Sequence, residues 1–184
     1  IAMGMCGYDR VLVEPSGVYD VDEFFDVLRD EPLDRWYKIG NVITVVNAKL
    51  EPELSEMSEY LLASEAAHAG AVVLSRAEEA TEEEMQATIM HLNRALEKVH
   101  CGRRLDQEII RKGSLSLTDA DFAKIQQCGY VQENYQKMDL IEENSFDTVY
   151  VMERKMTVEE ILAGMNKIFA DPSCGEVFRI KGFM

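Results

Sequence analysis

The sequence predicts an α/β protein built around a parallel sheet and followed by a smaller α+β piece. Short apolar runs bounded by turn residues alternate with longer segments whose apolar residues recur every three or four positions. Such short runs are typical of strands buried on both faces, and the longer segments are typical of amphipathic helices. Strands that alternate with helices in this way form parallel sheets joined by right-handed crossovers.

The first expected strand runs from Arg10 to Glu14 and therefore ends in an acid. A Pro-Ser-Gly turn follows at residues 15–17, and then an acidic helix is expected over Asp20–Arg29. Because ligands of open α/β sheets bind outside the carboxyl ends of the strands, Glu14 is a candidate functional residue. The structural alternative is a simple turn, in which Glu14 caps the backbone and Gly17 supplies a positive φ.

The rest of the first domain, residues 1–136, continues the alternation. Capping signatures at Thr81 and Thr118 mark two of the helix starts. Further strands are expected over Asn41–Asn47 and Ala71–Leu74, a short edge strand at Val99–Cys101, and helices over Pro52–Ala69, 81–99, Leu105–Lys112 and Thr118–Tyr130.

A polar stretch without clear periodicity, residues 132–143, is expected to link the first domain to a second piece at residues 137–184. There, strands that alternate apolar and polar residues are expected at Phe146–Met152 and Glu176–Gly182. Between them, a capping box at Thr157 opens a helix that ends at Ala170. This β-α-β order predicts a small open-faced α+β domain.

Composition narrows the classes of partner. The net charge of −15 argues against nucleic acid and anionic membrane surfaces as main partners. No apolar run approaches the roughly 20 residues that span a bilayer, and the first residues lack a signal-peptide pattern, so a cytoplasmic location is expected. The four scattered cysteines are expected to be free thiols, and neither they nor the three histidines show metal-ligand spacing.

Four segments in chain order carry one pattern: Val11–Gly17, Val42–Ala48, Ala63–Glu79 and Val177–Phe183. Together they resemble the CobW/HypB/UreG-like P-loop GTPases. The first resembles the Walker-B strand that ends in E-x-x-G, and the second resembles the strand that ends in Asp-Ala, with Asn47 in place of Asp. The third resembles the stretch that carries the guanine-reading N-K-x-D motif, and the fourth resembles the R-x-K-G strand of the CobW C-terminal domain.

The resemblance implies a SIMIBI-type P-loop NTPase-like domain, with GTP and Mg²⁺ as cofactors. Glu14 would hold Mg²⁺ through a water molecule, and Gly17 would let the backbone approach the γ-phosphate. In the N-K-x-D-like segment, Glu78 would take the place of the Asp that reads the guanine N–H donors, and Arg76 would stack like the Lys stem. Ser75 lacks the amide of the family's Asn, so a weakened guanine preference is expected. The structural alternative for Ser75–Glu78 is a plain strand-to-helix loop.

The phosphate-binding loop G-x-x-x-x-G-K-[ST] and the metal motif C-x-C-C of the family do not occur in the sequence. In the family both lie upstream of the Walker-B strand, so the chain is expected to be N-terminally incomplete, with a partial C-terminal domain. Zn or Co would be handled by that upstream segment.

The resemblance implies a GTP-dependent metallochaperone or metal-cofactor insertion factor, as in cobalamin synthesis. Its partners would be a nucleotide, a metal ion or client metalloprotein, and a second copy of the chain in a homodimer. The alternative is a degenerate or truncated member that acts as a binding or scaffold module without hydrolysis. A third hypothesis, a non-nucleotide enzyme with Glu14 as base, lacks a partner His or Cys on a neighbouring strand end.

Overall fold

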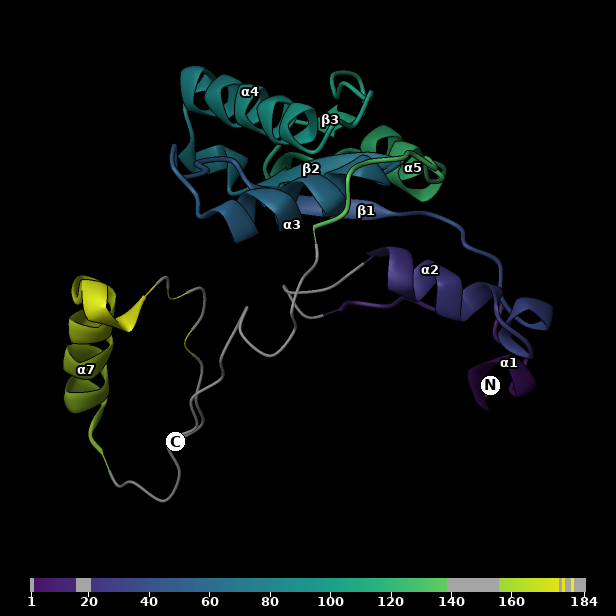
Figure 1. The fold of residues 1–184 in the computed structure, drawn as a ribbon, viewed down its shortest axis with the longest axis horizontal. Helices are drawn as coiled ribbons and strands as arrows, with labels where there is room; N and C mark the ends of the chain where they lie inside the picture. Colours follow the sequence, from purple (N-terminus) through teal and green to yellow (C-terminus); the bar gives the residue numbers. More distant parts are fainter. Residues whose placement is uncertain (1, 16–20, 139–155, 176, 178–179, 181–184) are drawn as a thin grey trace. The chain divides into compact units, whose positions relative to one another are not determined.

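The computed structural model describes residues 2–15, 21–138, 156–175, 177 and 180 (Figure 1). The chain divides into two compact units, Ile1–Ile141 and Glu142–Met184. The strand expected at Phe146–Met152 lies outside the described residues, and so does the strand expected at Glu176–Gly182 apart from Val177 and Ile180.

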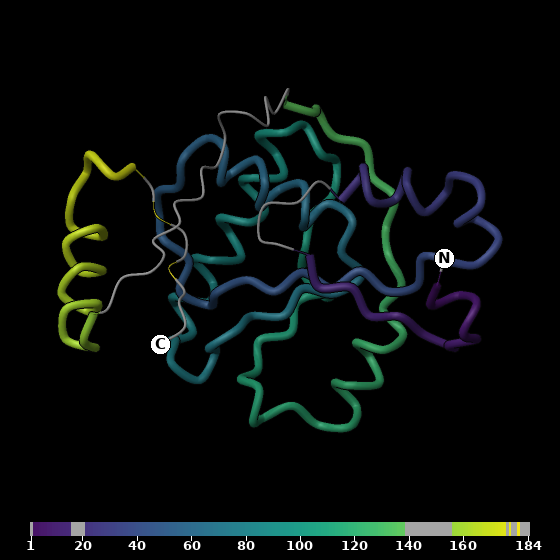
Figure 2. The backbone as a smooth tube through the Cα atoms, turned by 90° about the horizontal axis from the view of Figure 1, so that it is seen from below, coloured from purple at the N-terminus to yellow at the C-terminus, as the bar shows by residue number. Residues whose placement is uncertain are grey.

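The first unit contains a parallel sheet, which confirms the predicted α/β class. Its three strands, in the order β1-β2-β3, are β1 (Ile43–Asn47), β2 (Ala71–Ser75) and β3 (Ile109–Ile110). Both strand pairs are parallel, and Figure 2 shows β1 and β2 running side by side. The crossover from β1 to β2 contains α3 (Glu56–Ala67), and the crossover from β2 to β3 contains α4 (Glu82–Lys98).

The core lies between one face of the sheet and these two helices. Val46 of β1 and Leu74 of β2 are register partners, and both belong to a buried cluster with Leu92 and Leu96 of α4. The other face of β1 is open, because Val45 remains 64% exposed. The prediction that β1 is buried on both faces is therefore wrong: its side chains alternate between buried and exposed.

The predicted helices are confirmed where local signals mark them. Complete capping boxes open α4 at Thr81, α5 at Thr118 and α7 at Thr157. The helices of the first unit outside the crossovers are α1 (Ala2–Met5), α2 (Val21–Arg29) and α5 (Asp119–Gln126), with short 3₁₀ turns η1 (Leu33–Arg35), η2 (Ala77–Glu79) and η3 (Ser114–Ser116). In the second unit, α7 (Val158–Ala170) precedes η4 (Pro172–Cys174).

Three local predictions are wrong. Residues 10–14 form no strand, and Leu12 is 89% exposed, because three apolar residues supply a tendency to extend but not a neighbouring strand to pair with. The helix expected over Leu105–Lys112 is absent, because Ile109 and Ile110 pair with β2 instead. The edge strand expected at Val99–Cys101 is the turn that ends α4, with His100 at a φ of 55°.

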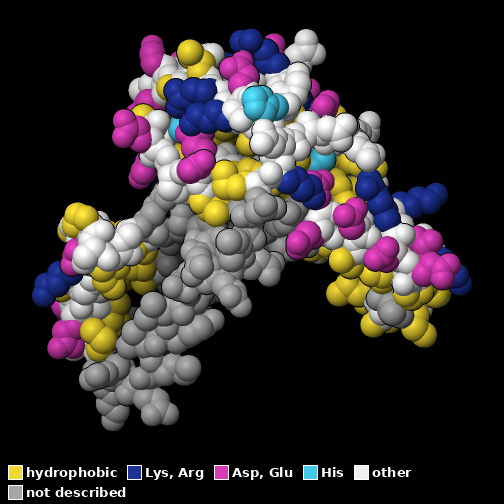
Figure 3. Space-filling model, viewed as in Figure 1, with side chains coloured by type: hydrophobic (Ala, Val, Ile, Leu, Met, Phe, Trp, Pro, Cys, Tyr) yellow, Lys and Arg dark blue, Asp and Glu magenta, His cyan; other side chains and the backbone are white. Residues whose placement is uncertain are grey.

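The surface that Figure 3 shows mixes acidic and basic side chains around α4. Hydrophobic side chains gather instead at the end of the first unit that carries α1, where Met3, Met5, Tyr8 and Trp36 are exposed (Figure 3). None of the helices in the described part of the chain is both long enough and apolar enough to cross a bilayer.

Candidate functional site

The carboxyl ends of the parallel strands form the first candidate site. Asn47 and Ser75, the last residues of β1 and β2, are register partners and so lie side by side. Both side chains serve the backbone: the Ser75 hydroxyl donates to the Val46 carbonyl (3.2 Å), and Asn47 Oδ1 accepts from the Lys49 amide (3.0 Å). These two side chains therefore stabilise the carboxyl ends of β1 and β2.

The N-K-x-D-like segment continues directly from this edge. Arg76 is exposed and adopts a left-handed conformation with a φ of 56°, which turns the chain from β2 into η2. Glu78 is exposed in η2 and lies against Gly113, where an added Cβ would collide with the Glu78 carboxylate. The structure thus brings Ser75, Arg76 and Glu78 together at one edge.

The sequence did not indicate Gly113 as a candidate site residue. A helix was predicted over Leu105–Lys112, so the end of β3 just before Gly113 was not expected. Two adjacent β-branched residues, Ile109 and Ile110, were the available signal for a strand there.

The structure does not bring Glu14 to this edge as the end of a strand. Glu14 lies in a segment without helix or strand, its side chain is exposed, and it forms no hydrogen bond or ion pair with the described residues. Gly17 lies outside the described residues. No three His, Cys, Asp or Glu side chains of the described ranges lie close enough to hold a metal ion. Glu14 is a single carboxylate, so Mg²⁺ bound to it would need further oxygen ligands from nucleotide phosphates and water.

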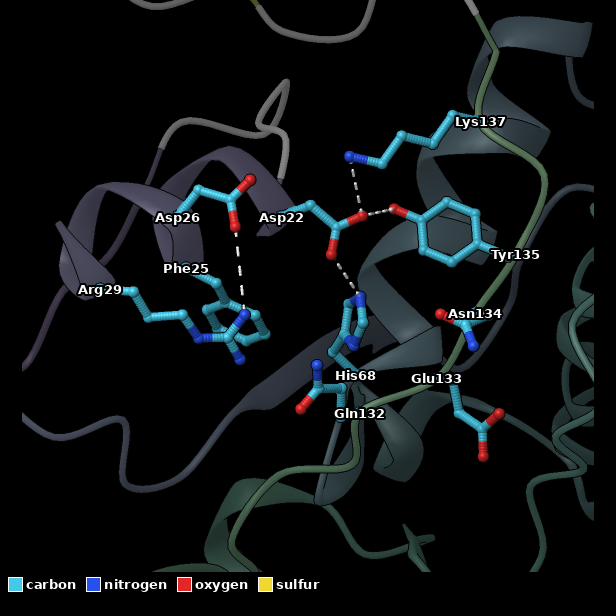
Figure 4. A pocket seen from close by; sticks show the side chains of 10 residues that line it. All are labelled: Asp22, Phe25, Asp26, Arg29, His68, Gln132, Glu133, Asn134, Tyr135 and Lys137. Carbon is cyan, nitrogen blue, oxygen red and sulfur yellow. Dashed lines mark hydrogen bonds and ion pairs between the residues drawn. The ribbon is translucent and has the colours of Figure 1, made fainter.

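A second candidate site is an open pocket of about 210 Å³ around His68 (Figure 4). Three side chains converge there on the Asp22 carboxylate. His68 Nε2 lies 2.8 Å from Oδ1, while the Tyr135 hydroxyl (2.9 Å) and the Lys137 ammonium (3.2 Å) both reach Oδ2. Asp22 comes from α2, His68 ends α3, and the other two come from the segment 130–138.

The His68 ring is not available as a general base. It is 1% exposed, and its Nδ1 lies 3.0 Å from the Val131 carbonyl oxygen, which only accepts hydrogen bonds. Its Nε2 lies 2.8 Å from the Asp22 carboxylate, although the direction is not that of a hydrogen bond. Because both nitrogens face acceptor oxygens, neither presents a lone pair to a substrate, and His68 therefore acts as a structural residue.

The Asp22 carboxyl is held in its charged form. Partial burial would raise its pKa, but hydrogen bonds from Tyr135 and Lys137 and the charges of His68 and Lys137 outweigh that effect and lower the pKa from 3.8. Such a carboxylate is a stable anchor for its cationic and hydroxyl partners rather than an acid-base catalyst.

A third cluster joins α3 to α4 in the core. Glu59 and His91 are both buried, and Glu59 Oε1 lies 2.7 Å from His91 Nε2. Lys98, which is 55% exposed, reaches the same oxygen at 3.3 Å, and Glu59 Oε2 is buried without a hydrogen-bond partner among the described residues. These contacts link the two crossover helices α3 and α4.

Glu65 of α3 is expected to make stability depend on pH. Burial raises its pKa from 4.5 to about 7, so the folded protein keeps a proton that the unfolded chain releases. The free energy of unfolding therefore falls as the pH rises from about 4.5 to about 7. We expect Glu65→Gln to stabilise the protein by about 1–3 kcal/mol at pH 8 and by little at pH 4, measured by urea unfolding. Equal effects at both pH values would contradict this cause.

Comparisons with known proteins return no match: no protein-family model, no curated protein and no solved structure shows significant similarity to this chain.

Proposed function

We propose that this chain forms the base-reading part of a CobW-like GTP-binding domain, in a protein that acts as a GTP-dependent metallochaperone or metal-cofactor insertion factor. One observation carries the proposal. The N-K-x-D-like segment Ser75–Glu78 lies at the carboxyl edge of a parallel sheet, between Asn47 and Gly113, which is where ligands of α/β sheets bind.

The segment offers groups suited to a purine base. Glu78 is exposed and presents an acceptor pair for N–H donors, while the guanidinium of Arg76 is planar and stacks on aromatic faces. The Ser75 hydroxyl already donates to the backbone, so it adds little to recognition. The proposed site therefore prefers guanine through Glu78, with less selectivity than a site that carries an Asn amide.

Glu14 enters the proposal as the residue that would hold Mg²⁺ through a water molecule, and Gly17 as the residue that would let the backbone approach the γ-phosphate. Mg²⁺ in nucleotide sites is held by one or two carboxylates together with substrate phosphates and water. When bound, the ion would neutralise charge on those phosphates. Since Glu14 is a single carboxylate in a segment outside the sheet, no catalytic step is assigned to it.

A second candidate function, a binding or scaffold module without hydrolysis, is favoured by a separate observation. The side chains that end β1 and β2 are engaged with the backbone, and Glu14 forms no hydrogen bond or ion pair with the described residues. Such a protein would keep the interactions of the fold but would not turn over nucleotide.

A GTPase assay on the full gene product separates the two functions. The GTP-dependent function predicts hydrolysis above the uncatalysed rate with Mg²⁺, assayed alone and with added Zn²⁺ or Co²⁺. As a control, the 184-residue chain is expected to bind GTP more weakly than micromolar by calorimetry, because it has no G-x-x-x-x-G-K-[ST] loop. Absence of hydrolysis with every metal would leave the scaffold function.

A further inference from the structure

Two side chains one helical turn apart fasten α2 to the body of the first unit. Phe25 is the buried residue of α2, and its ring packs edge-on against His68 (5.3 Å between centroids) and Tyr130 (5.5 Å). Asp22 forms the ion-pair contact with His68 and accepts the hydrogen bond from Tyr135. Both anchors of α2 thus meet the same histidine.

The segment 130–138 also contacts His68. The Val131 amide donates to the His68 carbonyl (3.1 Å), and the His68 Nδ1 lies 3.0 Å from the Val131 carbonyl oxygen. The Tyr135 ring packs edge-on against His68, with centroids 5.8 Å apart. Figure 4 shows His68, Tyr135 and Lys137 all pointing toward the Asp22 carboxylate.

We propose that these residues form a clasp that couples α2 to the segment 130–138, so that the two elements detach together. The Asp22 clasp consists of Asp22, Phe25, His68, Tyr135 and Lys137. Asp22 belongs to α2 and is the shared acceptor for two side chains of the segment 130–138. When α2 detaches, the Tyr135 hydroxyl and the Lys137 ammonium both lose the Asp22 carboxylate as their partner. Contacts that share a partner in this way have coupled rather than additive effects.

The clasp links two parts of the chain with different roles. On one side, α2 follows the Glu14–Gly17 segment in the sequence, and on the other, the segment 130–138 leads toward the second unit, which begins at Glu142. Resting on the proposed function, the clasp would transmit a change at Glu14–Gly17 to the connection with the second unit. The coupling between α2 and the segment 130–138 itself does not depend on nucleotide.

Three other charged groups line the pocket, Asp26, Arg29 and Glu133, and the Arg29 guanidinium lies over the Phe25 ring, 5.7 Å from its centroid. Asp26 and Arg29 of α2 lie 4.0 Å apart and form a helix-surface pair, and the Asp26 side chain is 75% exposed. Asp26 therefore offers a matched control, since it is a carboxylate on the same helix and the same pocket wall.

Amide hydrogen exchange on the 184-residue chain tests the clasp without nucleotide. Asp22→Asn is expected to raise exchange at least fivefold in both α2 and the segment 130–138, with α4 as an unchanged internal reference. Tyr135→Phe is expected to raise exchange in α2, although the substitution lies in the other element. Asp26→Asn is expected to leave both elements unchanged.

Two results would overturn the clasp. One is faster exchange confined to the element that carries each substitution; the other is faster exchange that spreads to α4 in both variants, which would be global destabilisation. A separate experiment adds GTP to the full gene product. GTP is expected to change the exchange at 130–138, and Asp22→Asn is expected to remove that change. If GTP does not bind at all, the proposed function fails while the nucleotide-free result still decides the clasp.

Discussion

Gly70→Ala is expected to lower the free energy of unfolding by about 3 kcal/mol, in the range of severe overpacking. A Cβ at position 70 would collide with the carbonyl oxygens of Cys128 and Gly129. These are backbone atoms in a crowded crossing, since the Gly70 amide donates to Val42 (2.8 Å) and the Val42 amide donates to Gly129 (2.9 Å). The collision can be relieved only by moving the strand connection, so the midpoint of urea unfolding should fall sharply.

Gly102→Ala is the matched control for this substitution. No atom lies within 4 Å of the position that a Cβ at residue 102 would take. A change of no more than about 0.5 kcal/mol is therefore expected. Equal losses for the two alanine variants would show that the crossing at Gly70 is not tight.

His91→Ala is expected to destabilise the protein by about 3 kcal/mol, because it leaves the buried Glu59 carboxylate without its imidazole partner. Lys98 retains its contact with Glu59 at 3.3 Å, but that lysine is 55% exposed and replaces the lost interaction only in part. Chemical unfolding at neutral pH measures the loss.

Two further variants separate the charge effect from simple truncation. Arg94→Ala, at an exposed position of the same helix, should change stability by no more than about 0.5 kcal/mol. The double variant Glu59→Leu with His91→Leu removes both polar partners, so it should be less destabilised than His91→Ala alone. A double variant that loses more than the single one would mean that packing volume, not the unpaired carboxylate, dominates.

Local signals predicted α2, α3, α4, α5 and α7 and two of the three strands. Thr81, Thr118 and Thr157 each open a helix through contacts made within four residues of sequence, so the capping signature is complete before any tertiary contact forms. The strands β1 and β2 are formed by unbroken apolar runs in which β-branched residues are frequent.

Long-range contacts decided the elements that the sequence did not reveal. The two-residue strand β3 exists because Ile109 and Ile110 pair with β2, and the apolar run that begins at Val11 lacks such a partner. His68 caps α3, and Gly70 two residues later is required because another backbone crosses it closely.

The clasp around His68 was equally invisible in the sequence. Asp22 and Tyr135 are separated by 113 positions, and neither carries a motif. The sequence places His68 at the end of the helix expected over Pro52–Ala69, and this position does not identify its partners. The edge formed by Ser75, Arg76 and Glu78 was easier to predict. These residues lie at the end of one strand and directly after it, so they stay together in any parallel sheet.

The most direct test of the proposed base-reading edge is GTP and ATP binding to the full gene product, measured by calorimetry for Glu78→Ala beside Glu79→Ala. Both glutamates are exposed neighbours in η2, and the atoms nearest to a Cβ at Gly113 are those of Glu78. The proposal predicts that Glu78→Ala weakens GTP binding about tenfold, the loss expected for a charge-assisted hydrogen bond, and leaves ATP binding unchanged. Unchanged GTP affinity in Glu78→Ala, or equal losses in the two variants, would contradict it.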